Sequence, residues 1–154
     1  MSRPLIQRQH AVEQVASTLL PQASLLQRLV AKQACWTLTR SEGSVLSTLS
    51  EAPQRITTLA ELEGLAQPTV TIIVKRLEEC GWVARVRDSL DGRVVLVSIT
   101  QEGRDALESF REQYRTLLRE QMATMDDAKI AELVRATTAL AGMVEALQDS
   151  ASSS

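Results

Sequence analysis

The chain has 154 residues, of which 44% are hydrophobic and 23% are charged, an ordinary balance for a soluble globular protein. Aromatic residues make up only 3%, so the core is expected to be aliphatic and to consist mostly of packed helices. The formal net charge is −2, with 17 Lys and Arg against 19 Asp and Glu. This balance excludes a strongly basic nucleic-acid-binding protein, so any such function must rest on local charge.

The residue types that hold metals or carry out catalysis are sparse. Cys35 and Cys80 are far apart and His10 is the single histidine, so neither a zinc site nor a disulfide framework is expected. Neither a Gly-rich phosphate loop nor a Ser–His–Asp set stands out, which argues against an enzyme and gives no reason to expect a cofactor. The N-terminus lacks a signal-peptide-like apolar run, and no segment approaches the roughly 20 apolar residues that span a bilayer. A cytoplasmic protein without a membrane partner is predicted.

The first part of the chain is expected to be helical. Residues 5–34 carry apolar side chains at helical spacing, and Pro21 is expected to kink or break this segment into two helices. Thr39 and Glu42 have the spacing of a capping box, which predicts the start of the next helix. Pro53 is expected to end that helix.

Two short helices joined by a tight turn are predicted next. The first begins at Thr57 or Thr58 and stops at Gly64. The second has Pro68 in its first turn, where the fixed φ of proline suits a helix, and it ends at Gly81. Its buried face is predicted to hold an i, i+3, i+4, i+7 set: Val70, Ile73, Val74 and Leu77.

A β-hairpin is predicted directly after these helices. The segments 82–87 and 93–99 are rich in Val and flank the pair Asp91-Gly92. An Asp-Gly pair between two such segments is a strong hairpin signal, because Gly tolerates positive φ. A helix-turn-helix followed at once by a hairpin is the order of elements in a winged helix domain.

The C-terminal part is again expected to be helical. Thr100 is predicted to cap a long helix and Asp126 a last one, before a disordered tail at residues 149–154. The apolar positions in segments 5–19 and 107–147 exceed what one small winged domain can bury. A second copy of the chain is therefore expected to cover them, giving a homodimer.

These residues, in this order, resemble the MarR family of transcriptional regulators over about residues 38–104. Three pieces carry the resemblance: QPTVTIIVKRLE at 67–78, GWV at 81–83, and DGR at 91–93 followed by LVSIT at 96–100 and GR at 103–104. The resemblance implies a mainly α fold with a small β-hairpin wing (α+β). In it, a winged helix-turn-helix domain at residues 37–100 lies between dimerisation helices at 1–36 and 101–148.

The resemblance also implies a function. Family members bind a pseudopalindromic duplex as homodimers, typically repress genes, and in many cases release DNA on binding a small, often aromatic ligand. The function predicted is therefore a DNA-binding transcriptional regulator, a repressor released by a small ligand, and not an enzyme. The alternative is a winged helix module that contacts protein and not DNA, which the slightly acidic charge balance keeps open.

The second short helix supplies most of the candidate DNA contacts. If its apolar face points inward, its other face can enter a major groove, where Gln pairs with adenine, Lys reaches guanine or phosphate, and Ile touches a thymine methyl group. The alternative is a structural helix with exposed polar positions. With the wing included, the predicted DNA-binding residues are Gln67, Pro68, Thr69, Thr71, Ile72, Lys75, Arg76, Arg87, Asp91 and Arg93.

The predicted wing carries Arg85, Arg87 and Arg93. A narrow A·T-rich minor groove has an enhanced negative potential that attracts an inserted arginine. The resemblance implies that Asp91 fixes the guanidinium of Arg93 by a salt bridge. The alternative is a solvated hairpin held by an Asp–Arg pair.

Some residues depart from the usual pattern of the family. Ala66 stands where a capping Ser is usual, and Gly43 where a bulky residue is common. At positions 62 and 63 the family usually has a polar residue followed by Leu, whereas this chain has Leu62 followed by Glu63. Ile72 replaces a residue that is commonly polar. The first four positions bear on local packing, and Ile72 bears on the preference for DNA sequence.

The resemblance also implies an effector pocket. Ligands of the family sit between the dimerisation helices and the DNA-binding lobe, so the resemblance makes His10, Trp36 and Arg40 candidate effector-binding residues. Trp36 is otherwise a core residue, and His10 a solvated or dimer-contact residue. Neither Cys35 nor Cys80 matches the position of the reactive cysteine in the redox-sensing branch of the family, so a structural role is expected for both.

Overall fold

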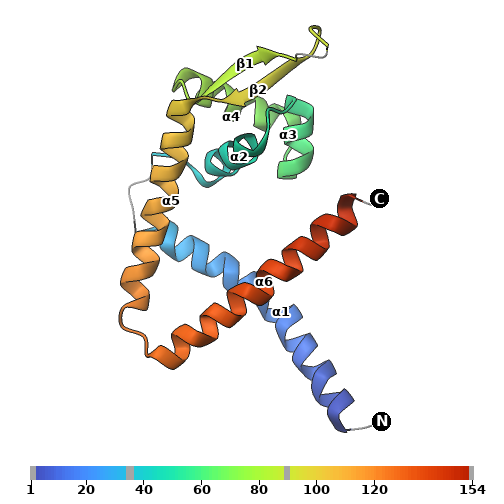
Figure 1. Ribbon diagram of the computed structural model, residues 1–154, viewed down its shortest axis with the longest axis vertical. Helices are drawn as coiled ribbons and strands as arrows, with labels where there is room; N and C mark the ends of the chain where they lie inside the picture. The colour runs from blue at the N-terminus through green and yellow to red at the C-terminus, as the bar shows by residue number, and fades with distance from the viewer. Residues whose placement is uncertain (1–2, 34–36, 89–90, 153–154) are drawn as a thin grey trace. The chain divides into compact units, whose positions relative to one another are not determined.

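The computed structural model describes residues 3–33, 37–88 and 91–152, and within them six α-helices and a two-stranded sheet (Figure 1). The chain forms two compact units, one up to Arg115 and one from Thr116 on. The mainly helical fold with a small hairpin confirms the predicted fold class.

The first helix, α1 (Arg3–Ala31), is a single helix that contains Pro21. The prediction that Pro21 divides this segment into two helices is wrong. A proline removes one backbone N–H donor and crowds the preceding turn, but a helix of this length retains its hydrogen bonds on both sides of that position. Val30, near the end of α1, is buried.

The second helix, α2 (Arg40–Glu51), begins with the predicted capping box. The Thr39 hydroxyl accepts a hydrogen bond from the Glu42 backbone N–H at 3.3 Å. The Glu42 carboxylate accepts one from the Thr39 backbone N–H at 2.7 Å. Two backbone donors at the start of the helix are thereby satisfied, so the prediction is confirmed.

The helix-turn-helix is formed by α3 (Ile56–Glu63) and α4 (Gln67–Glu79). α3 begins at Ile56, slightly before the predicted Thr57 or Thr58, and Gly64 ends it in the left-handed conformation at φ +63°. Pro68 lies in the first turn of α4, as predicted.

The core of the first unit lies between α2, α3, α4, the hairpin and the start of the long helix that follows the hairpin, α5 (Gln101–Met122). Val70, Val74 and Leu77 on α4 are fully buried, and Ile73 is partly buried against them, so the predicted apolar face is confirmed. The core is almost wholly aliphatic, as the low aromatic content implies; its buried members are Leu38, Val45, Leu46, Leu49, Leu59, Ala60, Val70, Val74, Leu77, Val83, Val97, Ile99, Leu107 and Phe110.

The strands β1 (Val83–Arg87) and β2 (Val95–Ile99) pair antiparallel, with Val83 opposite Ile99 and Arg87 opposite Val95. The predicted hairpin is thus confirmed, but the reason given for it is wrong. Gly92 does not have positive φ, and β1 ends at Arg87 while β2 begins only at Val95, so the connection is longer than a two-residue turn. In this loop the Val94 N–H donates to the Asp91 carbonyl at 2.9 Å, and the Asp88 N–H donates to the Val94 carbonyl at 3.0 Å.

The helix α5 (Gln101–Met122) begins where the hairpin ends. The Thr100 hydroxyl accepts a hydrogen bond from the Gly103 N–H at 3.0 Å, which confirms the predicted cap, and donates one to the Gly81 carbonyl at 2.7 Å. A Cβ at Gly103 would overlap the carbonyl oxygen of Trp82. Glycine is therefore what lets α5 start this close to β1.

The first turns of α5 belong to the core of the first unit. Leu107 and Phe110 belong to the apolar positions that were predicted to be covered by a second copy of the chain. They are instead buried within their own chain. The ring of Phe110 lies against Gly43 of α2, where a Cβ would come within 2.6 Å of the ring carbon Cε1. The Phe110 ring occupies the space that a side chain at position 43 would need, which explains why glycine stands where the family commonly has a bulky residue.

The second unit contains the end of α5 and α6 (Asp127–Ser152). The Asp126 side chain accepts a hydrogen bond from the Lys129 N–H at 2.8 Å, so the predicted cap of the last helix is confirmed. α6 continues to Ser152, so residues 149–152 extend the helix where the sequence suggested a disordered tail.

Candidate DNA interface

The face of α4 that points away from the core is exposed along its length. Gln67, Thr71, Ile72 and Lys75 all lie on it, together with Pro68. Ile72 is 70% exposed, which is an unfavourable place for a large apolar side chain unless a partner covers it. The Thr71 hydroxyl donates to the Gln67 carbonyl at 2.9 Å, so its oxygen remains an acceptor and its methyl group is available for contact.

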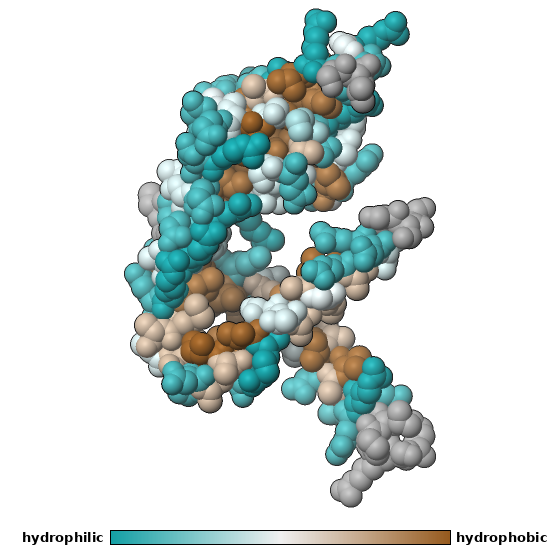
Figure 2. All heavy atoms as spheres, in the orientation of Figure 1, coloured by the Kyte–Doolittle hydropathy of each residue, from teal (hydrophilic) through white to brown (hydrophobic). Residues whose placement is uncertain are grey.

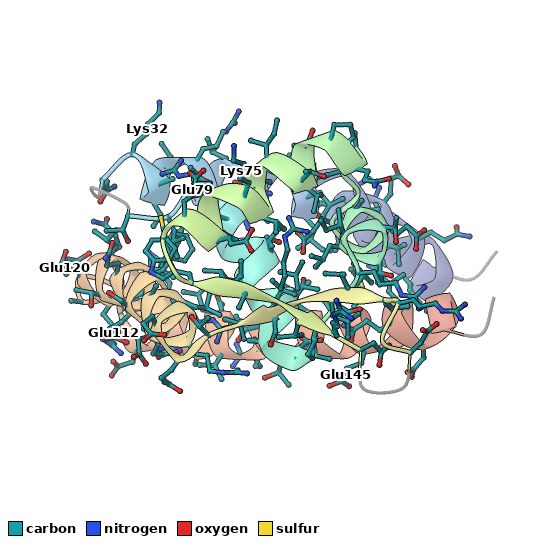
Figure 3. The ribbon with its side chains drawn as sticks, turned by 90° about the horizontal axis from the view of Figure 1, so that it is seen from above. Lys32, Lys75, Glu79, Glu112, Glu120 and Glu145 are labelled. Atoms are coloured by element: carbon teal, nitrogen blue, oxygen red, sulfur yellow. The ribbon has the colours of Figure 1, made fainter. Side chains whose placement is uncertain are left out.

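Lys75 is weakly restrained. Figure 3 shows Lys75 and Glu79 on α4, and their side-chain charges are 3.9 Å apart, with both side chains largely exposed. An exposed pair one helical turn apart contributes little to stability. The Lys75 ammonium can therefore exchange Glu79 for a phosphate or a guanine at small cost.

Arg76 lies on a different side of α4 from Lys75. Its Nε atom is 3.0 Å from Oε1 of Glu42, on α2, while the arginine side chain is 58% exposed. Arg76 is thus tied to the helix-turn-helix scaffold and partly open to solvent. Thr69, the remaining candidate on this helix, is exposed in its first turn.

The wing carries exposed Arg87 at the end of β1 and exposed Asp91 and Arg93 in the loop. The Asp91 carboxylate accepts a hydrogen bond from the Arg93 backbone N–H at 3.0 Å. Within the described part of the hairpin, Asp91 and Arg93 form no ion pair. The carboxylate orders the backbone of the loop instead, and the guanidinium keeps its donors for a partner.

Two further arginines near the wing were not among the predicted site residues. Arg55 and Arg85, with Thr57, line a shallow pocket of about 350 Å³ between the start of α3 and the hairpin. Arg85 also lies 3.3 Å from the Glu78 carboxylate of α4. The pairing of Gln54 with Val97 brings the start of α3 beside β2, a contact between distant segments that sequence spacing does not reveal.

A second pocket, of about 480 Å³, lies between α1, α2 and α5 within the first unit. The residues that line it are Gln27, Arg40, Ser44, Ser47, Phe110 and Tyr114. Of the three predicted effector-binding residues, Arg40 lines this pocket. His10 is exposed on α1 and is not one of its lining residues, and Trp36 lies outside the described residues.

Other kinds of site find little support in the described residues. Cys80 is an exposed free thiol at the end of α4, and Cys35 lies outside the described residues. Across residues 3–33, 37–88 and 91–152, no cluster of His, Cys, Asp and Glu has the arrangement that a metal ion requires. None of the helices in these ranges combines the length and the apolar character of a membrane span.

The exposed face of α4 and the adjoining arginine-bearing hairpin define a class of protein, the winged helix-turn-helix DNA-binding proteins. Residues 38–95 match the model of the MarR family. The chain is 29% identical over 98 residues to YpoP of Bacillus subtilis, described as an uncharacterized HTH-type transcriptional regulator, and this alignment covers 63% of the chain and 70% of YpoP. Residues 38–95 therefore carry a MarR-family domain, and the relative that the chain resembles is described as a transcriptional regulator.

Solved structures share this fold. RV1404 from Mycobacterium tuberculosis is 28% identical with a TM-score of 0.73, over 87% of this chain and 94% of RV1404. BpsR from Bordetella bronchiseptica, whose DNA binding is described as regulated by 6-hydroxynicotinic acid, is 21% identical with a TM-score of 0.57, over 82% of this chain and 98% of BpsR, and shows the fold alone. The chain spans 57–70% of the length of the curated relatives that it matches.

Proposed function

We propose that the chain represses transcription by binding a pseudopalindromic duplex as a homodimer. Each protomer inserts α4 into a major groove and its hairpin into a flanking minor groove. The observation that carries this proposal is the exposed face of α4, where a polar set and a 70% exposed Ile72 lie opposite a fully buried apolar face. Gln67, Thr71 and Lys75 supply the groups that read bases or bind phosphate.

Local charge supports a nucleic-acid partner although the chain as a whole is slightly acidic. Arg85, Arg87 and Arg93 lie on the hairpin, and Arg55 lies beside its base. The nearby carboxylates are engaged with backbone or with basic side chains: Asp91 with the loop backbone and Glu78 with Arg85. A duplex that approaches this side therefore meets arginines whose charges attract phosphate.

We propose further that a small aromatic anion releases the DNA by binding in the pocket between α1, α2 and α5. Phe110 and Tyr114 pack edge to face, with ring centroids 5.0 Å apart, and offer an aromatic wall. Arg40 brings a planar cation suited to a carboxylate, and Ser44 a hydroxyl. Such a ligand changes DNA affinity only to the extent that it binds the free and DNA-bound forms differently.

The test of DNA binding compares two lysines in similar surroundings. Lys75 and Lys129 both have largely exposed side chains, and each lies near a carboxylate close in sequence: Lys75 is 3.9 Å from Glu79, and Lys129 is 3.7 Å from Asp126. Lys75→Ala should weaken binding to a duplex selected by the wild-type protein from a random library, whereas Lys129→Ala should leave it unchanged. Fluorescence anisotropy over a salt series gives both affinities.

The salt series also tells what Lys75 meets. If it meets phosphate, Lys75→Ala weakens all sequences alike and lowers the salt slope by about one unit. If it meets guanine, the change costs roughly 1–3 kcal/mol and relaxes specificity at one base pair. Equal affinities of Lys75→Ala and wild type would contradict insertion of α4 into the groove. Failure of the wild-type protein to bind any duplex would favour a protein partner instead.

A further inference from the structure

Glu42 is the one charged side chain that is buried in the described residues, with an exposed fraction of 3%. A buried carboxylate is costly unless charge and hydrogen bonds compensate it. Both of its oxygens are engaged. Oε2 accepts a hydrogen bond from the Thr39 N–H at 2.7 Å, and Oε1 lies 3.0 Å from Nε of Arg76.

These two contacts join parts of the fold that act differently. Thr39 marks the start of α2, whereas Arg76 is carried by α4, the helix that we propose enters the groove. The carboxylate of Glu42 thus links the start of α2 to α4. The contact is made at Nε of the Arg76 guanidinium, and the described residues show no hydrogen bond from its two terminal nitrogens.

We propose that Glu42 is a positioning residue for DNA binding: it holds Arg76 so that the terminal nitrogens of the guanidinium grip a phosphate of the DNA backbone. This inference rests on the proposed function. The Arg76 side chain is 58% exposed although its Nε atom contacts a buried carboxylate. Two parallel N–H groups of a fixed guanidinium match two phosphate oxygens.

Holding Arg76 before DNA arrives reduces the entropy lost on binding. A free arginine side chain has several rotatable bonds, and immobilising it on a phosphate costs affinity. Glu42 fixes the side chain in the unbound protein, so that cost is met during folding. The charge of Glu42 stays shielded from the DNA because it is buried behind the guanidinium.

The test separates this role from helix capping. In Glu42→Gln, the amide oxygen can still accept from the Thr39 N–H, since Gln serves as well as Glu in a capping box, but the ion pair with Arg76 is lost. In Thr39→Ala, the hydroxyl cap is lost while the Glu42–Arg76 pair remains. Thermal melts are expected to show both variants folded.

Glu42→Gln and Arg76→Gln should each lower affinity for a random-sequence duplex about tenfold, a readily measured change of about 1.4 kcal/mol. The double variant should lose little more than either single one, because both changes break the same link. Thr39→Ala should bind within about twofold of wild type, and Arg76→Lys should restore only part of the affinity because Lys lacks the planar fork. Equal losses in Thr39→Ala and Glu42→Gln would overturn the inference, as would unchanged affinity in Glu42→Gln.

A measurement without DNA separates this inference from the proposed function. In the nuclear magnetic resonance spectrum of the free protein, the Nε–H of Arg76 should exchange with water at least about tenfold more slowly than that of exposed Arg93, because its Nε atom is ion-paired with a buried carboxylate. Glu42→Gln should abolish this difference. If the wild type binds no duplex, the proposed function fails, but the exchange rate still reports whether Glu42 restrains Arg76. Fast exchange in the wild type would refute the inference that Glu42 restrains Arg76.

Discussion

At the scale of single residues, the start of α4 is less well capped than the starts of α2 and α5. Thr39 and Thr100 accept hydrogen bonds from backbone N–H groups through their hydroxyls. Ala66, the residue before α4, makes no side-chain cap, and only its carbonyl contributes, by accepting the N–H groups of Thr69 at 2.9 Å and Val70 at 3.2 Å. The helix that we propose contacts DNA therefore begins without a side-chain cap.

Replacing Ala66 by Ser should stabilise the protein. Ala66 has an extended backbone, with φ −65° and ψ 139°, which is the conformation an N-cap requires. A serine hydroxyl there would accept a hydrogen bond from the first turn, worth about 0.5–2 kcal/mol. Urea denaturation of Ala66→Ser beside wild type measures the gain, with Thr39→Ala as a control that should lose a similar amount. A lower midpoint for Ala66→Ser would show that the site is already satisfied.

At the scale of elements, the hairpin presents its loop to solvent while its base is fixed in the core. Val83, Val97 and Ile99 are buried, whereas the loop residues Asp91 and Arg93 are exposed. A side chain in the loop contributes little to folding, so its substitution is expected to change binding and not stability.

Arg93→Ala should therefore lower DNA affinity at least about tenfold and shift the free energy of unfolding by less than about 0.5 kcal/mol. The loss should be larger on duplexes with A·T-rich flanks, where the minor groove is narrow. Arg93→Lys should recover part of it, since it keeps the charge but not the planar fork. Parallel binding titrations and thermal melts measure both quantities. Unchanged affinity in Arg93→Ala would remove the wing from the interface.

The elements also show what the sequence could and could not predict. The caps at Thr39, Thr100 and Asp126 were predictable because a capping signal spans only a few residues. The Glu42–Arg76 pair and the pocket shared by Arg55 and Arg85 were not, because each joins segments that only tertiary packing brings together. The hairpin was predictable from its two Val-rich segments, whereas the Asp-Gly pair between them did not reveal the longer connection.

At the scale of the whole molecule, both end helices carry apolar side chains that the chain itself leaves uncovered. Figure 2 shows brown, hydrophobic residues on the surfaces of α1 and α6. The exposed large hydrophobic residues of these helices are Val12, Val15, Leu20, Leu25, Leu26 and Leu29 on α1, and Leu133, Val134, Leu140, Met143, Val144 and Leu147 on α6. So many exposed apolar side chains on two helices are typical of an interface.

The protein should therefore be a dimer in the absence of DNA. Multi-angle light scattering should give twice the mass of the chain at micromolar concentration. Val15→Glu, which introduces a charge on the apolar side of α1, should shift the equilibrium toward monomer, while Gln14→Glu on the neighbouring exposed position should not. A monomeric wild-type protein would contradict the proposed arrangement.

The contact between Phe110 and Gly43 has a consequence for how the sequence can evolve. The ring occupies the volume that a side chain at position 43 would fill, so neither residue can change size alone. Relatives that carry a bulky residue at position 43 should carry a smaller one at position 110, with the sum of the two volumes nearly constant. Phe110 also lines the pocket between α1, α2 and α5. A lineage that exchanges these two sizes would thus reshape the pocket and change the ligands it admits without altering the residues of α4 that face the DNA.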